Sequence, residues 1–197
     1  MRIGVVSDVH GNLEALDLAL QYMGDVDEVI CTGDASDQAR FSDGVVGRLR
    51  DIGAHFVRGN HDDALLYGIR PRPPQGDAAL LQWTRDQPSV LSTVVHGKKV
   101  LIFHATPWER DQDYIFPGSN AHRRLAGEDA DVVVYGHTHW QDVSTVGSTL
   151  ILNPGSTGQP RDPRHPREDS CAILDLPSGD VQIISFPDPV LARGQLL

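Results

Sequence analysis

The chain has 197 residues, a mass of 21.5 kDa and a formal net charge of −10. This length predicts a single domain, residues 1–197, that can bury a core of its own. Hydrophobic residues make up 40% and charged residues 22% of the chain, which indicates a globular protein and excludes a disordered one. Because duplex binding requires Lys and Arg to neutralise phosphates, the acidic balance argues against general nucleic-acid binding. A small phosphorylated substrate stays open, since bound metal ions can reverse the local charge.

Two features of the sequence bear on the cellular compartment. The longest apolar runs are too short to cross a bilayer, and Asp8 interrupts the first run before any signal-peptide cleavage site. Cys31 and Cys171 each stand beside apolar residues, which favours two buried reduced thiols over a disulfide. We therefore expect a cytoplasmic protein with no membrane partner; its oligomeric state stays open.

The first third of the chain alternates short apolar runs with stretches of helical periodicity. In the first such stretch, leucines recur at helical spacing behind Asn12, which is a suitable N-cap. The expected order is strand 2–7, helix 12–23, strand 26–32, helix 41–52 and strand 55–58. This alternation indicates βαβ units and a mainly parallel sheet, in which ligands bind beyond the carboxyl ends of the strands.

The remainder of the chain is richer in strands and loops. Prolines mark 67–76 as a loop, and His96-Gly97 lies in a hairpin turn between strands 92–95 and 100–104. Helices are expected at 77–85 and 120–126, and further strands at 132–135, 141–146, 149–152, 171–175 and 181–186. The stretches 107–119 and 154–167 read as loops, and the tail 187–197 as loosely held. No internal repeat or low-complexity segment is present.

The expected strands end in residues that can bind metal ions, often beside a glycine. Five strand ends deliver such residues: Asp8 and His10, Asp34, Asn60 and His61, His104, and His137 and His139. If these strands lie in neighbouring sheets, the side chains converge on one rim. Oxygen and imidazole donors without thiolates suit six-coordinate divalent ions, whereas a structural zinc site normally shows Cys. Two such ions about 3.5–4 Å apart can hold a bridging hydroxide and clamp a phosphoryl group.

The ordered set of these motifs resembles the calcineurin-like metallophosphoesterase superfamily. The motifs are Asp8-x-His10, Gly33-Asp34, Gly59-Asn60-His61-Asp62, His104 and Gly136-His137-Thr138-His139, and Asn153-Pro154-Gly155-Ser156 matches a further segment of its small bacterial and archaeal phosphodiesterases. The resemblance implies an α/β fold in which two mixed sheets pack as a sandwich flanked by helices, in four layers.

The resemblance also implies roles for individual residues. Asp8, His10 and His139 would hold the first metal ion. Asn60, His104 and His137 would hold the second, and Asp34 would bridge them. His61 would protonate the leaving oxygen as general acid, oriented by Asp37 or by the competing Asp62. Manganese is the favoured metal, with iron, cobalt, nickel or zinc as alternatives.

Some positions depart from the family pattern. Gln38-Ala39 stands where protein phosphatases carry an Arg-Gly pair, which disfavours a phosphoprotein substrate. The smallest phosphodiesterases often have Cys at the position of His61, and many members have Gly where Phe103 precedes His104. Arg58 looks like the phosphatase form of its motif, so it is a candidate substrate-binding residue together with Asn60; a structural ion pair is an equal alternative.

Residues outside the motifs receive structural interpretations first. We expect surface or satisfied polar roles for His55, His96, His122 and His165, although His122 lies in a segment that could line the substrate mouth. Core packing is favoured for Trp83, while Trp108 and Tyr114 follow His104 closely and are candidates for stacking on a base or aryl group. The basic run Arg161, Arg164 and Arg167 reads as a solvated loop face.

The sequence therefore predicts a dinuclear metal-dependent phosphoesterase that acts on a phosphodiester or a nucleotide-like monoester through a metal-bridging hydroxide. Alternatives are a diadenosine-polyphosphate or nucleotide hydrolase, a protein phosphatase and, less favoured, a non-enzymatic scaffold on the same fold. Segments 65–91 and 108–126 are the expected lids, where specificity would reside.

Overall fold

The protein is a sandwich of two five-stranded mixed sheets, seen here in a computed structural model that describes residues 1–68, 73–108 and 113–193. The first sheet has the order β10-β9-β1-β2-β3 and the second the order β4-β5-β6-β8-β7. The first comprises β1 (Arg2–Val6), β2 (Glu28–Cys31), β3 (His55–Phe56), β9 (Glu168–Asp175) and β10 (Asp180–Pro187). The second comprises β4 (Val90–Val95), β5 (Lys98–Phe103), β6 (Val132–Val134), β7 (Gln141–Val146) and β8 (Thr149–Pro154). The expected α/β sandwich is confirmed.

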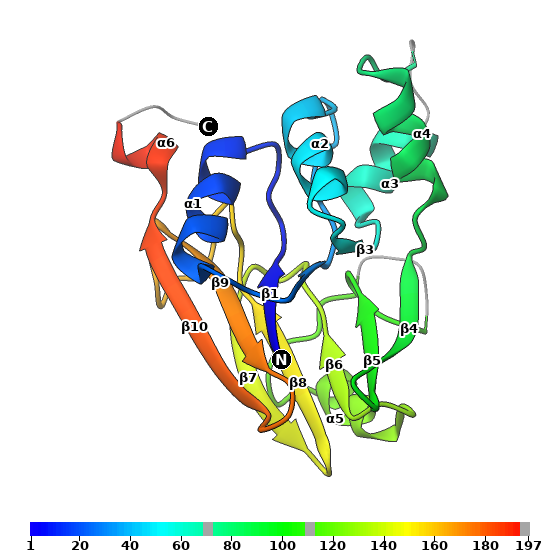
Figure 1. Ribbon diagram of the computed structural model, residues 1–197, viewed down its shortest axis with the longest axis vertical. Helices are drawn as coiled ribbons and strands as arrows, with labels where there is room; N and C mark the ends of the chain where they lie inside the picture. Colours follow the sequence, from blue (N-terminus) through cyan, green and yellow to red (C-terminus); the bar gives the residue numbers. More distant parts are fainter. Residues whose placement is uncertain (69–72, 109–112, 194–197) are drawn as a thin grey trace.

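Helices cover the outer faces of both sheets. They are α1 (Leu13–Met23), α2 (Asp43–Asp51), α3 (Asn60–Tyr67), α4 (Ala78–Asp86), α5 (Asn120–Arg124), a 3₁₀ turn (Leu125–Gly127) and α6 (Pro189–Ala192). In Figure 1, α1 to α4 and α6 gather toward one end, and α5 lies at the other. No helix in the described ranges is long and apolar enough to span a membrane.

Alternating side chains divide the core into an inner and two outer layers. Val100 and Ile102 of β5 pack between the sheets with Ile3 and Val5 of β1. Leu101 and its neighbours on the other face of the second sheet pack under α5 and the 3₁₀ turn. On the outer face of the first sheet, a third cluster packs beneath α1 and α2. The period-two alternation of strand side chains thus lets the second sheet fill two layers at once.

The strand directions determine where the chemistry-bearing loops emerge. In the first sheet β1, β2 and β3 run parallel, and in the second β6 lies between β5 and β8, parallel to both. Every predicted metal-binding motif follows the carboxyl end of one of these strands. The loops from both sheets therefore meet at one edge of the sandwich.

Most predicted elements are present, and two helices were missed. The hairpin is confirmed, with His96 and Gly97 at φ values of 47° and 77° in its two-residue turn. Helix α3 begins at Asn60, where the sequence suggested only a strand end, because its pattern is weak and its buried face includes Asp62. Parts of the expected lids, residues 69–72 and 109–112, and the tail residues 194–197 lie outside the described residues.

The missed helix α6 brings together two buried carboxyl groups. Asp188 caps α6 by accepting hydrogen bonds from the backbone N–H groups of Val190 and Leu191 at 2.8 and 2.6 Å. Asp169, at the start of β9, is fully buried, and neither of its carboxyl oxygens has a hydrogen-bond donor among the described residues. Burial, and then the neighbouring Asp188, raise the pKa of Asp169 to about 9. The pair lies where the end of β10 and α6 meet the start of β9.

Candidate metal centre

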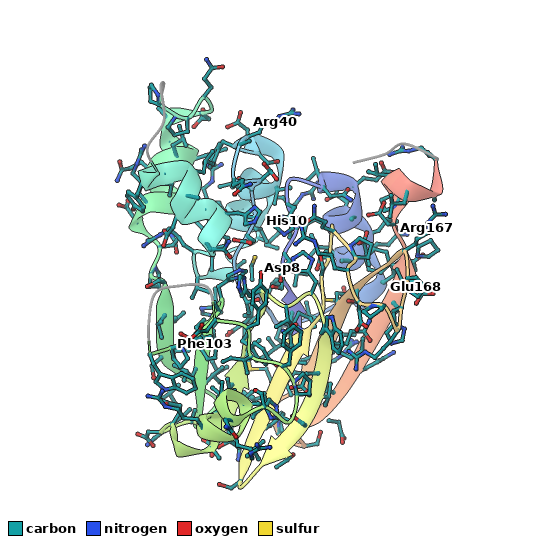
Figure 2. The ribbon with its side chains drawn as sticks, turned by 180° about the vertical axis from the view of Figure 1, so that it is seen from behind. Asp8, His10, Arg40, Phe103, Arg167 and Glu168 are labelled. Atoms are coloured by element: carbon teal, nitrogen blue, oxygen red, sulfur yellow. The ribbon has the colours of Figure 1, made fainter. Side chains whose placement is uncertain are left out.

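The predicted metal-binding residues converge where the two sheets meet. Asp8 and Asp34 follow β1 and β2, Asn60 opens α3 after β3, His104 follows β5, and His137 and His139 follow β6. Figure 2 shows Asp8 and His10 near the middle of the molecule, between the helices and the strands. Residues separated by up to 131 positions in the chain thus share one site, as the strand-end argument predicted.

Five of these residues adopt a left-handed backbone conformation. Among the described residues, seven other than glycine have positive φ, and five of the seven are Asp8, His10, Asp34, His137 and His139, at 49–68°. Each such conformation costs about 1–3 kcal/mol and persists only where the surroundings enforce it. Strain of this kind clusters at functional sites, because it aims side chains that a relaxed backbone would turn elsewhere.

Backbone hydrogen bonds and glycines enforce these conformations. The N–H of Asp8 donates to the carbonyl of Gly33 at 3.1 Å, and the N–H of His137 donates to the Asp8 carboxylate at 3.0 Å. A Cβ on Gly136 would collide with Ser7 and Asp8. The glycines beside the ligands therefore permit close approach between the loops, as the sequence suggested.

The first group of donor atoms comprises Asp8, His10 and His139. The Nε2 of His139 lies 3.3 Å from the Oδ1 of Asp8 and 3.3 Å from the Nε2 of His10. The Nδ1 of His139 faces the carbonyl of Gln159 at 2.5 Å, so this nitrogen must hold the ring proton. In the neutral ring, Nε2 then presents a bare lone pair to a carboxylate oxygen, an arrangement that a cation between them stabilises.

A buried oxygen with no donor supports the same interpretation. The Oδ1 of Asp8 is buried and accepts no hydrogen bond from any described residue. Buried polar atoms are nearly always satisfied, so an exception requires an explanation such as an ion. The donors Asp8, His10 and His139 lie within 4.8 Å of one another, which fits a single metal ion.

The second group repeats this pattern around His104. Its Nδ1 donates to the carbonyl of Thr32 at 2.8 Å, so its Nε2 is bare in the neutral ring. That Nε2 lies 3.0 Å from the Oδ1 of Asn60 and 3.3 Å from the Oδ2 of Asp34. Three acceptor atoms thus point at one another, which again fits a cation. Because Asp34 Oδ2 also lies 3.9 Å from His10 Nε2, this carboxylate sits between the two groups.

His137 lies beside the second group. Its ring centre is 5.0 Å from that of His104, and the ring of Tyr114 stacks on it at 4.2 Å. Its donor atoms are not among the three sets that fall within 4.8 Å of one another. The structure therefore brings His137 to the site but does not place it as tightly as the other expected ligands.

Electrostatics at the site favour ionised carboxylates. Burial opposes ionisation of Asp8, but the imidazoles of His139 and His104 outweigh it and hold its pKa well below the usual value. The pKa of Asp34 is also lowered: burial raises it, but the imidazole of His104 lowers it by more. Burial lowers the pKa of His104, yet the carboxylates of Asp34 and Asp8 raise it to about 10. The site is thus built to hold negative charge beside imidazole.

His61 lies within the site but not with the expected carboxylate partner. Its Nδ1 accepts a hydrogen bond from the backbone N–H of Gln38 at 3.2 Å, while Asp37 binds the N–H of Ala39 instead. A backbone group, and not Asp37, thus contacts Nδ1 of His61 here, and the orientation of His61 by Asp37 stays a prediction. With Nδ1 as acceptor, the neutral ring carries its proton on Nε2, which lies 4.0 Å from Asp34.

Asp62, the other expected partner of His61, serves as a brace. Its carboxyl accepts hydrogen bonds from the backbone N–H groups of Ser36 and Gly59 at 3.1 and 3.0 Å, which ties the loop after β2 to the start of α3. Burial, and then the charge of Asp34, raise its pKa to about 7. The position of Asp62 in the first turn of α3 directs it away from His61.

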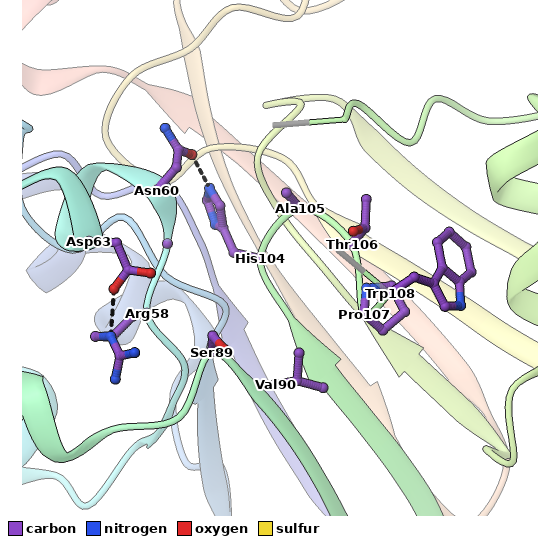
Figure 3. A pocket seen from close by; sticks show the side chains of 11 residues that line it. Arg58, Asn60, Asp63, Ser89, Val90, His104, Ala105, Thr106, Pro107 and Trp108 are labelled. Carbon is purple, nitrogen blue, oxygen red and sulfur yellow. Dashed lines mark hydrogen bonds and ion pairs between the residues drawn. The ribbon is translucent and has the colours of Figure 1, made fainter. Parts of the chain in front are cut away.

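Arg58 forms the structural ion pair that the sequence left open. Its Nε donates to Asp63 at 2.6 Å, and its Nη1 donates to the carbonyls of Arg85 and Gln87 at the end of α4. Figure 3 shows Arg58 turned toward Asp63, with Asn60 and His104 facing each other. Arg58 borders the cavity, but its guanidinium is already engaged.

Two cavities flank the candidate metal centre. One, of about 250 Å³, runs from Asn60 and His104 past Thr106 to Trp108 (Figure 3). The other, of about 340 Å³, borders His10 and is lined by Asp37, Arg40, Ser42 and Gln159, among others. Both open beside predicted ligands, so a substrate can approach the centre from either side.

The residues outside the motifs behave largely as expected. His122 is buried, and its Nε2 lies 2.9 Å from Asp142 and 3.0 Å from Ser144, so it is a satisfied core histidine. Trp83 packs against Phe56, with ring centres 5.3 Å apart. Cys31 and Cys171 are both free and buried. These side chains take no part in the centre.

Some functional contacts were missed by sequence reasoning. The partners of His61, His104 and His139 are backbone groups of Gln38, Thr32 and Gln159, and backbone groups leave no mark in the sequence. The segment Asn153-Pro154-Gly155-Ser156 resembles the family in sequence, but the sequence does not indicate which residues it contacts. In the structure, the Asn153 amide binds the carbonyl of Gly136 at 2.9 Å, and Ser156 binds that of Asp8 at 2.8 Å. The segment thus supports two ligand loops.

Comparison with known proteins agrees with this geometry. The model of the calcineurin-like phosphoesterase superfamily domain matches residues 1–179. An uncharacterized protein of Methanocaldococcus jannaschii is 30% identical in an alignment that covers 81% of this chain and 77% of that protein. A second protein of this organism, named "Probable metallophosphoesterase", is 28% identical over 170 residues, covering 83% of this chain and 71% of its own.

A solved structure extends the likeness to three dimensions. The crystal structure of a metallophosphoesterase from Sphaerobacter thermophilus has a TM-score of 0.78 and 26% sequence identity, and the match covers 100% of this chain and 95% of that one. The family match spans all of the strand ends that build the candidate centre. The chain therefore belongs to the calcineurin-like phosphoesterase superfamily, a family of metal-dependent phosphoester hydrolases.

Proposed function

We propose that this protein is a dinuclear metal-dependent phosphoesterase that hydrolyses a phosphodiester or a nucleotide-like phosphomonoester. The main support is the pair of bare imidazole nitrogens, Nε2 of His139 and Nε2 of His104, each 3.3 Å from a buried carboxylate oxygen. Lone pairs facing one another in this way require positive charge between them, which a proton on His104 supplies in the metal-free site and a bound metal ion would supply in its place. Two such positions, with Asp34 between them, fit two divalent ions.

The donor sets assign ligands to each ion. Asp8, His10 and His139 would hold one, and Asn60, His104 and His137 the other, with the Asp34 carboxylate shared. Two bound divalent ions supply the positive charge that polarises a phosphoryl group and activates the attacking water. Manganese is our first choice, because the donors are oxygen and nitrogen atoms without thiolate.

His61 is the proposed general acid. The N–H of Gln38 occupies its Nδ1, so its mobile proton resides on Nε2, the nitrogen nearer to Asp34. In the neutral ring, the Gln38 N–H holds this orientation without a carboxylate partner. To act as an acid, the ring must first bind a second proton on Nδ1 in place of the Gln38 contact; the Nε2 proton can then pass to the oxygen of the departing alcohol and leave a neutral imidazole. Such proton transfer typically contributes about 10²–10⁴-fold to the rate.

The cavity beside His104 indicates a small substrate. Its volume of about 250 Å³ accommodates a phosphoester with one modest substituent. Asn60 lines this cavity, so it can both bind metal and approach the substrate. Arg58, also in the wall, is engaged by Asp63, which makes it a positioning residue for α3 rather than a phosphate clamp.

The test is turnover of a bis-aryl phosphodiester, an aryl phosphomonoester, nucleotides, a dinucleoside polyphosphate and a phosphopeptide, with Mn²⁺ before and after chelation. We expect the diester or a nucleotide monoester to be the best substrate, with activity lost on chelation and restored by Mn²⁺. Absence of metal-dependent turnover would overturn the proposal. Preference for the dinucleoside polyphosphate would indicate a nucleotide hydrolase instead, and preference for the phosphopeptide would indicate a protein phosphatase.

Two variants separate the proposed roles. Asp34→Asn should abolish turnover and lower the content of both metals, whereas His61→Ala should retain its metal and lose about 10²–10⁴ in rate. His55→Ala is the matched control, because His55 pairs with Glu28 at 2.8 Å away from the centre. Equal metal loss in Asp34→Asn and His61→Ala, measured by elemental analysis, would contradict this division of roles.

A further inference from the structure

A row of aromatic side chains leads outward from the candidate metal centre. The ring of Tyr114 stacks on His137 with centres 4.2 Å apart and planes at 20°. Phe116 continues the row, nearly parallel to Tyr114 at 5.9 Å, and Trp140 meets Phe116 edge-on at 5.2 Å. Tyr114 is 53% exposed and Phe116 37% exposed. Large aromatic surface is thus open to solvent directly beside a predicted ligand.

The segment that bears these two rings is firmly anchored. Ile115 stands between them and is fully buried in the outer core of the second sheet. The hydroxyl of Tyr135 donates to the carbonyl of Ile115 at 3.1 Å. Because the residue between them is held, the backbone that carries Tyr114 and Phe116 is anchored beside the centre.

The neighbouring tryptophans are already engaged. The guanidinium of Arg124 lies 3.9 Å from the ring centre of Trp108, and the indole N–H donates to Glu128. Trp140 is covered in the same way by Arg164 at 4.7 Å, which pairs with Asp162. Of the two candidates for stacking that the sequence suggested, Tyr114 is therefore the open one.

We propose that Tyr114 and Phe116 form an aromatic platform, which stacks on a planar ring carried by the substrate and so favours ring-bearing phosphodiesters over alkyl ones. This inference rests on the proposed phosphoesterase function and narrows its substrate class. Base–aromatic stacking is tolerant of ring identity and is typically strong enough to change affinity about tenfold or more. A nucleobase and a simple aryl group share this chemistry.

The position of the platform indicates which part of the substrate it holds. Tyr114 borders His137, whereas His61 borders His10, with ring centres 4.7 Å apart. His61 is the proposed donor to the leaving oxygen. The platform, on a different ligand, is therefore placed to hold the substituent that stays on phosphorus.

The experiment uses three diesters that share a 4-nitrophenyl leaving group and differ in the retained group: methyl, phenyl or thymidine 5′-yl. On Mn²⁺-loaded enzyme, we expect kcat/KM to be about tenfold higher for a ring-bearing diester than for the methyl diester, chiefly through KM. The phenyl and thymidine arms distinguish a ring directly on the phosphate from a base at nucleoside distance. Absence of preference for either ring in the wild type would overturn the inference.

Variants locate the preference. Tyr114→Ala should bring the ring-to-methyl ratio close to one, and Tyr114→Phe should keep it. Tyr22→Ala is the matched control, because Tyr22 is equally exposed, at 53%, and lies on α1. An unchanged ratio in Tyr114→Ala contradicts the platform. If this variant turns over none of the diesters, the ratio in Phe116→Leu decides in the same way.

Binding separates failure of the platform from failure of the proposed function. Calorimetry with thymidine 5′-monophosphate and methyl phosphate requires no turnover, and we expect about tenfold tighter binding of the nucleotide in the wild type but not in Tyr114→Ala. A wild type that hydrolyses none of the diesters would exclude the phosphodiesterase form of the proposed function, while the calorimetry would still judge the platform. Equal affinities for the two ligands would reject the platform alone.

Discussion

In two of the places where the protein buries carboxyl groups, the groups respond to burial in opposite ways. At the candidate centre, Asp8 and Asp34 have lowered pKa values despite full burial, because imidazoles surround them. At the junction of β9 and α6, burial raises the pKa of Asp169 to about 9, and Asp188 is the only charged neighbour among the described residues that contributes to this shift. All three carboxyl groups are buried, so the neighbouring charged groups decide whether the pKa falls or rises. The first pair is prepared for a cation, and the second holds a proton.

The largest expected effect comes from neutralising one carboxylate in each place. Asp8→Asn should reduce turnover at least about 10³-fold and lower metal content, because it removes a ligand charge. Asp169→Asn should leave turnover and metal content within about twofold of the wild-type values, since the amide replaces a protonated acid. Parallel kinetics and elemental analysis measure this difference. Similar losses in both variants would break the comparison.

The second effect is on the pH dependence of stability. The pKa of Asp169 rises from an ordinary 3.8 to about 9, so the folded state binds a proton that the unfolded state has released. Its stabilising contribution is complete below pH 4 and is lost as the pH rises through 9, with a limiting slope of about 1.4 kcal/mol per pH unit. Urea unfolding of the wild type and Asp169→Asn at pH 5.5, 7 and 8.5 should show the variant gaining relative stability. Parallel curves would refute the raised pKa of Asp169.

The third effect is stabilisation by metal. An ion that binds only the folded state adds about 2.7 kcal/mol to the free energy of unfolding at a concentration one hundred times its Kd. Mn²⁺ should therefore raise the Tm of the wild type and of Asp169→Asn, and do so much less for Asp8→Asn. Thermal unfolding with and without a chelator tests this. A similar rise in all three proteins would show that the ion binds elsewhere.

The smallest effect is expected for a pair that is neither buried nor strained. His55 and Glu28 lie 2.8 Å apart, with side chains 37% and 35% exposed. Exposed pairs contribute about 0–1 kcal/mol, so His55→Ala should change the free energy of unfolding by less than about 1 kcal/mol. Urea unfolding at pH 6 and pH 8 provides the measurement. A larger loss would mean that exposure is a poor guide to which pairs matter here.

The sequence was informative wherever a strand end coincided with a ligand. The positions of Asp8, Asp34 and His104 followed from buried apolar runs that stop at polar residues, and the sheet topology then brings the carboxyl ends together. Helix α3 escaped because Asn60 and His61 were interpreted as the end of a strand, although Asp62 satisfies the backbone at the start of a helix. The same residues form both the predicted metal-binding motif and the first turn of α3, so the motif concealed the start of the helix.

The orientation of the proposed catalytic and metal-binding side chains could not be predicted from the sequence. The ring of His61 is held by the backbone of Gln38, and that of His104 by the backbone of Thr32. Every residue has an N–H or a carbonyl to offer, so no residue type marks these partners. The stacking of Tyr114 on His137 likewise depends on how a loop returns to the site, which spacing alone does not determine.

The division of the proposed ligands between the two sheets has one more consequence. Asp8 and Asp34 emerge from the first sheet, and His104 and His139 from the second, so the full set of donors exists only after the halves have docked. In an incompletely assembled molecule, the donor groups of the two sheets are apart and cannot bind one ion together. On the proposed ligand assignment, the fraction of a preparation that retains metal through gel filtration should follow the fraction of correctly assembled molecules.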